Sequence, residues 1–173
     1  DEIIFAKQTP YQRIVITRWR NDTRLFLDRN LQFSSKDEYR YHESLVHPAL
    51  GLVRRRSQVL ILGGGDGMAA RECLKYPDLR RIDLVDIDPE MTRIFTEEPL
   101  LAELNDYALR SKRVHVVNQD AMKYLEETDR LYDVILMDLP DPSLLDLGKL
   151  YSRSFFSLAA HRLHPHGILA VQS

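Results

Sequence analysis

Residues 59–67 read Val-Leu-Ile-Leu-Gly-Gly-Gly-Asp-Gly, and the strongest fold signal of the chain lies here. A continuous apolar run of this kind is typical of a strand that is buried on both faces. The glycines after it allow a tight turn and a close approach of the backbone to a ligand, and the pattern then predicts a helix to about Lys75. The spacing is G-x-G-x-G, unlike the G-x-G-x-x-G of dinucleotide sites, which favours a nucleoside ligand without a pyrophosphate.

Strands and helices alternate after this turn. The pattern predicts strands over 82–87, 114–117, 132–137 and 168–171, helices from Pro89, over 121–127 and over 150–163, a loop over 138–148 and a turn at 165–167. Such alternation is typical of an α/β fold with a doubly wound parallel sheet. We therefore predict that residues 37–173 form one α/β domain.

The first 36 residues have a different pattern. Stretches 11–19, 25–27 and 31–33 are rich in β-branched, aromatic and apolar residues, and turn signals stand at 21–22 and 28–30. We predict a small antiparallel β-hairpin domain over residues 1–36. A helix over residues 37–56 follows, in which Pro48 is a possible break and Arg54-Arg55-Arg56 ends the element near the negative end of the helix dipole. These arginines are interpreted as a solvated face rather than a phosphate or RNA patch.

Composition excludes several classes of protein. The chain has 173 residues, of which 44% are hydrophobic, and a formal net charge of −2, so no basic excess favours nucleic-acid binding. Cys73 is the single cysteine, which excludes an internal disulfide and a Cys-rich zinc site and indicates a reducing compartment. The six histidines are scattered, so no metal site is predicted, and P-loop and nucleophile-elbow motifs are absent. No apolar segment is long enough to span a bilayer.

Three successive strands each end in a residue suited to a nucleoside. Gly63 and Gly65 lie in the first turn, Asp86 ends the second strand, and Asp120-Ala121 follows the third. An acidic residue about 20 positions after the glycines can accept hydrogen bonds from both ribose hydroxyls, and a further carboxylate can accept one from an adenine amino group. In open α/β sheets a ligand binds at this carboxyl edge, so we predict a nucleoside site there.

The fourth strand ends in a pair of carboxylates. Asp138 and Asp141 stand three residues apart in a proline-rich loop, and Asp66 adds a third negative charge across the same edge. Carboxylates so placed can hold a primary ammonium group or accept its proton during attack. Turn formation is the alternative explanation, because Asp-Pro often starts a turn.

In these motifs the sequence resembles the polyamine aminopropyltransferase (spermidine synthase) family over nearly its whole length. The matching segments are Thr9-Pro10-Tyr11-Gln12, Tyr41-His42-Glu43, Gly63-Gly64-Gly65-Asp66-Gly67, Val85-Asp86-Ile87-Asp88, Asp120-Ala121 and Asp138-Leu139-Pro140-Asp141-Pro142. The resemblance implies an N-terminal β domain and a Rossmann-like, methyltransferase-type domain. It also implies transfer of an aminopropyl group from decarboxylated S-adenosylmethionine to putrescine, which yields spermidine and 5′-methylthioadenosine.

The resemblance assigns roles by motif position. Gln12, Asp86, Asp120 and Ala121 are expected to bind the aminopropyl donor, and His42, Asp66 and Asp141 to hold the polyamine. Asp138 is expected to accept the proton. The donor is a co-substrate, so the expected reaction needs no bound cofactor and no metal.

The loop after the fourth strand departs from the usual family pattern, and it resembles a branch in which a membrane-spanning region precedes the synthase domain. We therefore expect a cytoplasmic domain whose parent protein is anchored in the cell membrane. The C-terminal part of the family fold is expected to lie outside this chain, leaving an exposed sheet edge. Family resemblance also implies a homodimer or higher homo-oligomer formed through the β domain.

Two other functions fit parts of this pattern. An S-adenosylmethionine-dependent methyltransferase would use the same glycines and Asp86, but it would not need the cation site formed by His42, Asp66 and the Asp138/Asp141 pair. A catalytically inactive domain that binds a polyamine or a nucleoside is the third possibility. Ligand binding without turnover would indicate that class.

Overall fold

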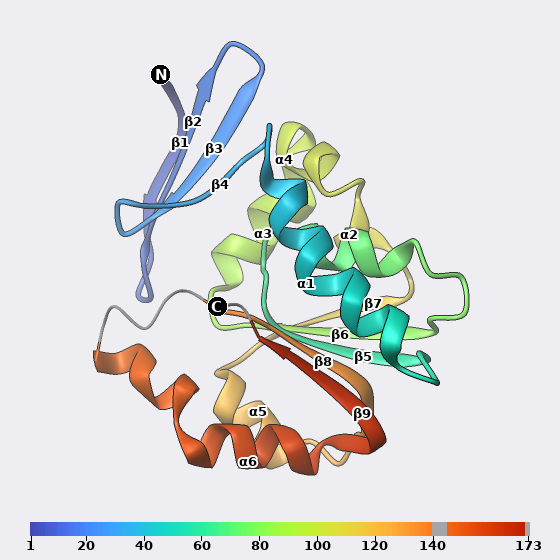
Figure 1. Cartoon of the computed structure of the whole chain (residues 1–173). Helices are drawn as coiled ribbons and strands as arrows, with labels where there is room; N and C mark the ends of the chain where they lie inside the picture. Colours follow the sequence, from blue (N-terminus) through green and yellow to red (C-terminus); the bar gives the residue numbers. More distant parts are fainter. Residues whose placement is uncertain (140–144, 172–173) are drawn as a thin grey trace.

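The computed structural model describes residues 1–139 and 145–171, and it contains two sheets. A four-stranded sheet in the order β1-β2-β3-β4 stands beside a five-stranded sheet in the order β7-β6-β5-β8-β9 (Figure 1). Neighbouring strands of the larger sheet are parallel throughout. Both the small antiparallel N-terminal sheet and the doubly wound parallel sheet were predicted, and both are confirmed.

The N-terminal sheet is an antiparallel meander. Its strands are β1 (Glu2–Gln8), β2 (Arg13–Trp19), β3 (Asp22–Leu27) and β4 (Asn30–Ser34). Two-residue turns join β2 to β3 and β3 to β4, with positive φ angles at Arg20, Asp28 and Arg29. Asp22, predicted in a turn, is the first residue of β3. The prediction did not resolve β1 as a strand of its own, because nearly all of its side chains are exposed and it lacks the alternation that marks a half-buried strand.

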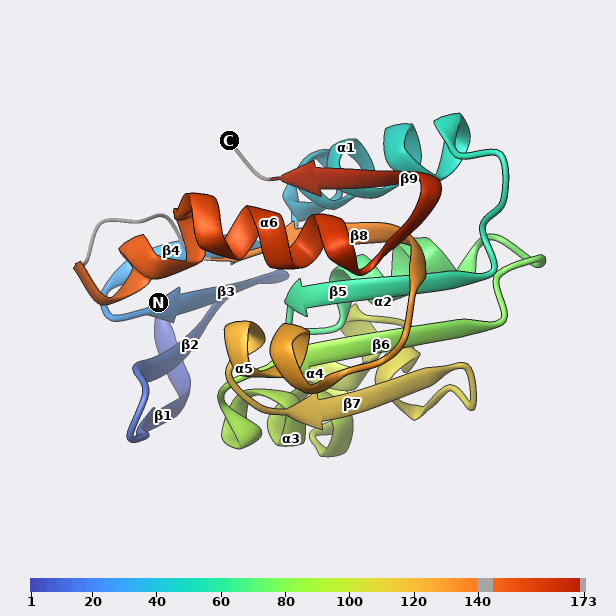
Figure 2. The same cartoon turned by 90° about the horizontal axis from the view of Figure 1, so that it is seen from below.

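The parallel sheet carries helices on both faces (Figure 2). Its strands are β5 (Gln58–Gly63), β6 (Arg81–Asp86), β7 (Val114–Asn118), β8 (Tyr132–Asp138) and β9 (Leu163–Val171). One face is covered by α1 (Glu38–Leu52), α2 (Met68–Leu74), α3 (Pro89–Glu97), α4 (Pro99–Leu104) and the short 3₁₀ helix η1 (Ala108–Arg110). The other is covered by α5 (Ala121–Glu127) and α6 (Arg153–His161).

Strand β5 shows how the sequence pattern becomes two cores. Successive side chains of a strand point to opposite faces. Val59 and Ile61 therefore join the core under α1 to α4, and Leu60 and Leu62 join the core under α5 and α6. All four are completely buried. Full burial of such a side chain stabilises the fold by about 1.5–3 kcal/mol, which explains why this strand has no polar position in its centre.

Helix α1 starts one residue after the predicted position and ends earlier than predicted. Pro48 lies inside the helix without ending it, and Val53 caps the C-terminus. Arg54-Arg55-Arg56 lie beyond the helix, so they do not end the element as predicted, and its last turn contains no basic residue. The buried face of α1 includes His42 as well as apolar side chains, which places a titratable group against the sheet.

The C-terminal segment differs from its prediction in two ways. The expected helix over 150–163 is divided into a 3₁₀ helix, η2 (Leu145–Tyr151), and α6, whose N-cap Ser152 accepts a hydrogen bond from the backbone N–H of Phe155. Strand β9 begins at Leu163 instead of 168. The predicted turn at 165–167 lies within β9, where the register of its pairing with β8 shifts. Leu163 pairs with Tyr132, whereas Ile168 pairs with Val134.

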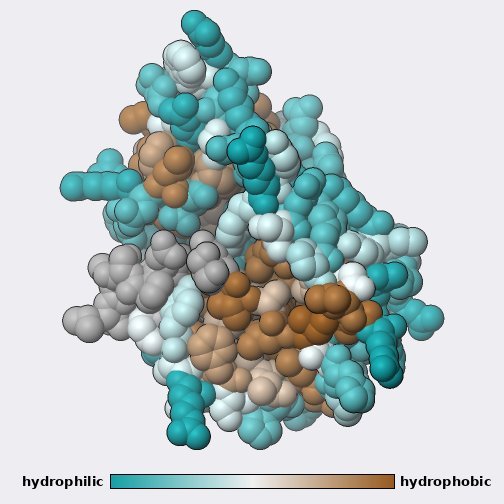
Figure 3. All heavy atoms as spheres, viewed as in Figure 1, coloured by the Kyte–Doolittle hydropathy of each residue, from teal (hydrophilic) through white to brown (hydrophobic). Residues whose placement is uncertain are grey.

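Strand β9 forms one edge of the larger sheet. Figure 3 shows an apolar surface in the region where β9 lies in Figure 1, and most side chains of this strand are only partly buried. An edge strand presents unpaired backbone groups. Across the two described ranges, no helix combines the length and the apolar character that crossing a bilayer requires.

Candidate active site at the carboxyl edge of the sheet

The glycine turn brings the ends of β5 and β8 into contact. Gly63 pairs with Asp138, and Gly63 and Gly64 both have positive φ angles, of 84° and 66°. A Cβ atom on Gly63 would lie 2.1 Å from the carbonyl oxygen of Asp138, and one on Gly64 would lie 2.9 Å from its Oδ2 atom. Only glycine combines this backbone conformation with so close an approach. The absence of a side chain at Gly64 therefore lets the Asp138 carboxylate lie against the glycine turn.

Gly65 contacts the acidic residue that ends β6. Its backbone N–H donates to Oδ2 of Asp86 at 2.9 Å, and the N–H of Asp88 donates to Oδ1 at 2.8 Å. Burial raises the pKa of Asp86 to about 6, against the lowering effect of these two bonds. A carboxylate has about four acceptor positions, so two remain for the ribose hydroxyls predicted to bind here.

We expect Gly65→Ala to disrupt this corner. The new Cβ would lie 2.5 Å from Oδ2 of Asp86, so the carboxylate must move and the hydrogen bond from residue 65 must break. Calorimetry should show adenosyl-ligand affinity falling by tenfold or more, since a hydrogen bond to a charged group contributes about 1.5–3 kcal/mol. Gly51→Ala is the control, because nothing lies within 4 Å of a Cβ there. Equal affinities for the two variants would contradict the prediction.

Asp88 joins the N-terminal sheet to this edge. Its Oδ2 atom accepts hydrogen bonds from the Thr9 hydroxyl at 2.8 Å and from Nε2 of Gln12 at 3.0 Å, and its Oδ1 caps α3 through the N–H of Glu90. Asp88 is almost completely buried. Gln12, predicted to bind the donor, is therefore held next to Asp86 by a residue that the sequence analysis did not select. Its side-chain oxygen remains an acceptor for a ligand.

The third loop lies beside the second. The N–H of Gln119 donates to the carbonyl oxygen of Asp86 at 3.2 Å, which places Asp120 and Ala121 next to the predicted ribose position. Asp120 caps α5 by accepting from the N–H of Lys123, and Nζ of Lys149 donates to its Oδ2 atom at 2.8 Å. Burial raises the pKa of Asp120, but these hydrogen bonds outweigh it, so the net shift is downward and the group is a carboxylate at neutral pH.

Three residues that we name the edge cluster meet between α1, the glycine turn and β8. They are His42, Asp66 and Asp138, and one polar atom of each lies within 4.8 Å of the others. Tyr41 donates to Oδ1 of Asp138 at 2.5 Å. Oδ2 of Asp138 is buried and has no hydrogen-bond partner among the described residues. A buried carboxylate oxygen without a donor is costly, so this atom is suited to a cationic or N–H donor group of a ligand.

His42 is held from behind by an ion-pair network. Its Nδ1 atom donates to Oε2 of Glu38 at 2.7 Å, and Nη2 of Arg71 donates to both carboxylate oxygens of Glu38, at 2.9 and 3.0 Å. Burial by itself lowers the pKa of His42. The bond to Glu38 and the charges of Asp66 and Asp138 outweigh this effect and raise the pKa to about 9. The imidazole is therefore a cation at neutral pH, with Nε2 facing Asp138 at 4.0 Å.

We expect an NMR titration to show His42 protonated up to about pH 9 and to show its pKa lowered by Glu38→Gln. Because the folded-state pKa exceeds the ordinary histidine value of 6.5, the stability that His42 contributes is complete below pH 6.5 and is lost as the pH rises through 9. Glu43→Gln, an exposed position of the same helix, is the matched control and should leave the titration unchanged. A wild-type midpoint near 6.5 would show that Glu38 does not set this charge.

Among the residues that the structure describes, two groups of side chains have spacings compatible with a metal ion. The first is the edge cluster, where a protonated His42 has no lone pair to give, so the pKa argues for an organic cation instead. The second consists of Glu43, His47 and Glu72, but Oε2 of Glu72 already accepts from Lys75 at 2.6 Å and from His47 at 3.0 Å. The prediction that the chain has no metal site stays a prediction.

The structure thus brings most of the predicted site residues to one edge. One group lies at the ends of β5 and β8 and consists of Gly63, His42, Asp66 and Asp138. The other group, which we name the nucleoside corner, consists of Gly65, Asp86, Gln12, Asp120 and Ala121. Asp141 lies outside the described residues. Sequence reasoning missed the supporting residues Glu38, Arg71 and Asp88. In the sequence these three residues lie within or next to the matching motifs, and this position could have indicated them.

Comparisons with known proteins agree with this geometry. Residues 38–173 match the family model described as the spermine/spermidine synthase domain. A polyamine aminopropyltransferase of Leptospira interrogans is 51% identical, and polyamine aminopropyltransferase 2 of Ralstonia nicotianae is 50% identical, each over the whole of this chain. The chain spans only 35% and 34% of the length of these relatives.

Solved structures show the same fold. A crystal structure of spermidine synthase in complex with the transition-state analogue AdoDATO superposes with a TM-score of 0.91 at 26% sequence identity. The match covers 98% of this chain and 57% of that one. The matching motifs, the arrangement of the two sheets and the family model over residues 38–173 all agree. The chain belongs to the spermine/spermidine synthase family.

Proposed function

We propose that this chain carries the active site of a polyamine aminopropyltransferase. In the proposed reaction an aminopropyl group passes from decarboxylated S-adenosylmethionine to putrescine, and the products are spermidine and 5′-methylthioadenosine. The curated relatives are named for this activity, and a structural neighbour is a spermidine synthase bound to a transition-state analogue. The single observation that carries the proposal is the buried Oδ2 atom of Asp138, which accepts no hydrogen bond from the described residues and lies beside His42 and Asp66.

The charge balance of the site suits an ammonium substrate. Glu38, Asp66 and Asp138 supply three carboxylates, whereas His42 and Arg71 supply two cations. The group therefore carries a net negative charge when its members are ionised, and one ammonium group would neutralise it. Burial removes competing water and strengthens this attraction, since Coulomb energies rise as the effective dielectric falls.

The chemical step requires a neutral amine, although a free alkylamine is protonated near pH 7. In the proposed mechanism the Asp138 carboxylate accepts the proton of the ammonium group. The freed nitrogen lone pair attacks the carbon next to the sulfonium sulfur, the C–S bond breaks, and its electron pair remains on sulfur, which becomes the neutral thioether of 5′-methylthioadenosine. The aspartate acts as a general base, and the two binding corners align nitrogen, carbon and sulfur.

Release of 5′-methylthioadenosine tests the proposal directly. The chain is mixed with decarboxylated S-adenosylmethionine and putrescine, and the nucleoside product is quantified by chromatography. The same assay with S-adenosylmethionine separates the methyltransferase alternative, whose product would be S-adenosylhomocysteine. Donor binding without either product would support an inactive binding domain. Absence of donor binding would contradict the prediction that a nucleoside binds near Asp86.

A homo-oligomer formed through the N-terminal sheet is part of the proposal. Large apolar side chains are exposed on that sheet, with Ile3 at 64%, Leu31 at 54% and Trp19 at 45% exposure. A second copy that covers them would remove apolar surface from water. Anchoring of the parent protein in a membrane stays a prediction.

A further inference from the structure

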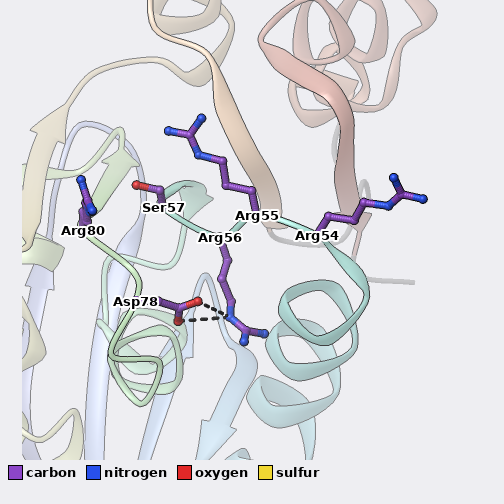
Figure 4. A pocket seen from close by; sticks show the side chains of 6 residues that line it. All are labelled: Arg54, Arg55, Arg56, Ser57, Asp78 and Arg80. Atoms are coloured by element: carbon purple, nitrogen blue, oxygen red, sulfur yellow. Dashed lines mark hydrogen bonds and ion pairs between the residues drawn. The ribbon is translucent and has the colours of Figure 1, made fainter.

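A pocket of about 430 Å³ lies beside the amino ends of β5 and β6 (Figure 4). It is lined by Arg54, Arg55, Arg56, Ser57, Asp78 and Arg80. These residues directly precede β5 and β6. Strand β5 has six residues, and a rise of about 3.3 Å per residue separates the pocket from the glycine turn by roughly 20 Å. The pocket is therefore a feature separate from the proposed active site.

Backbone hydrogen bonds fix the two segments that form this pocket. The N–H groups of Arg80 and Arg81 donate to the carbonyl oxygen of Ser57 at 2.9 and 3.0 Å. The N–H groups of Ser57 and Gln58 donate in turn to Oδ2 of Asp133 at 2.8 and 2.9 Å. Arg80 is thus anchored next to Ser57, although 23 positions separate them in the sequence. The basic side chains project from a rigid frame.

The pocket has an excess of positive charge. Four guanidinium groups and one carboxylate line it. The carboxylate, Asp78, is already bonded to Nε of Arg56 at 2.8 and 3.1 Å. Nε of Arg55 lies 3.9 Å from Oδ1 of Asp133, a long ion pair without a hydrogen bond. Within the described ranges Arg54 and Arg80 have no ion-pair partner, so two of the four positive charges are uncompensated in a chain that is acidic overall.

The geometry points to a phosphate ligand. Figure 4 shows the side chains of Arg55, Ser57 and Arg80 on the same side of the chain, whereas Arg54 points away from them. Guanidinium forks match pairs of phosphate oxygens, and a serine hydroxyl can donate a further hydrogen bond. We propose that Arg55, Ser57 and Arg80 form a binding site for a di- or triphosphate group. The sequence alone favoured a solvated face because the chain has a net charge of −2, and it could not place Arg80 beside Ser57.

Calorimetry with inorganic tripolyphosphate at low ionic strength tests this site. We expect the double variant Arg55→Gln/Arg80→Gln to bind at least tenfold more weakly than the wild type. The control Arg18→Gln/Arg29→Gln removes the same charge from exposed positions of the N-terminal sheet, and its affinity should stay within twofold of the wild type. ATP is the second probe. Equal affinity for both probes assigns recognition to the phosphates alone. Tighter ATP binding that is lost in the Arg55→Gln/Arg80→Gln variant assigns the source to a nucleotide, because ATP bound only at the predicted nucleoside site near Asp86 would not respond to this variant.

Three results would overturn the site. The first is absence of tripolyphosphate and ATP binding to the wild type. The second is an equal loss of affinity in both double variants, which would mean that overall charge and not the pocket attracts the anion. The third is binding to vesicles that contain anionic lipid without binding to tripolyphosphate, which would assign the arginines to a membrane surface. Neither variant alters a residue of the edge cluster, so this test is independent of aminopropyl transfer.

Discussion

Asp138→Asn is expected to lower the rate of 5′-methylthioadenosine formation by about 10²–10⁴-fold, the usual contribution of a positioned general base. Asparagine keeps an oxygen that can accept the hydrogen bond from Tyr41. It replaces the buried Oδ2 atom, which accepts no hydrogen bond from the described residues, with an amide nitrogen that cannot accept a proton. Donor affinity, measured by calorimetry, should change by less than threefold, because the nucleoside corner around Asp86 is untouched.

Asp106→Asn is the matched control for this variant. Asp106 is exposed and has a positive φ of 51°, a conformation that asparagine tolerates well. The control should retain the full rate. An Asp138→Asn variant that turns over at more than a tenth of the wild-type rate would remove Asp138 from the role of proton acceptor, even if the family assignment stands.

Asp66→Asn is expected to weaken amine binding and to stabilise the fold at the same time. The substitution removes one negative charge from the edge cluster, so the KM for putrescine should rise about 10- to 100-fold, as for loss of a hydrogen bond to a charged group. The donor KM should change far less. Asparagine can still accept the bond that the N–H of Met68 donates to Oδ1 of Asp66 at 2.9 Å, so the local backbone is preserved.

The stability effect follows from the shifted titration of this carboxyl. Burial, together with the charge of Asp138, raises the pKa of Asp66 from 3.8 to about 6, although the His42 cation acts in the opposite direction. A raised acid pKa means that the folded state binds the proton more tightly, so folding free energy is lost as the pH rises from 3.8 to 6. Above that window the loss reaches at most about 3 kcal/mol, and the substitution removes it.

Thermal unfolding at two pH values checks this result. At pH 8 the Asp66→Asn variant should melt several degrees above the wild type, since 1 kcal/mol corresponds to about 2–4 °C in a domain of this size. Below pH 4 the two should converge, because the wild-type carboxyl is then protonated in both states. A variant that melts at or below the wild-type temperature at pH 8 would show that attraction to His42 outweighs the burial cost of Asp66.

The elements that could be predicted are those whose signal is local. The strand over 59–62 and the glycine turn after it depend on neighbours in sequence, and both were found. Strand β1 has no alternation of apolar and polar residues, because nearly all of its side chains are exposed, so it was not resolved as a strand. The start of β9 was misplaced because Pro165 and Gly167 indicate a turn in any context. In the structure β9 pairs with β8 on both sides of this turn, at Leu163 and again from Ile168.

Sequence alone determined the alternation of strands and helices from β5 to β9, the glycine turn, and the carboxylates that end the strands. Chain connectivity sends the ends of parallel strands to one edge, so those residues had to meet. Only the tertiary structure decided their charges and partners. Glu38 and Arg71 lie 33 positions apart, yet their contact lowers the pKa of Glu38, and the bond to Glu38 in turn raises the pKa of His42. Arg80 reaches Ser57 only through the sheet. Electrostatic energy depends on distance and burial, and neither quantity can be derived from the spacing of residues along a chain.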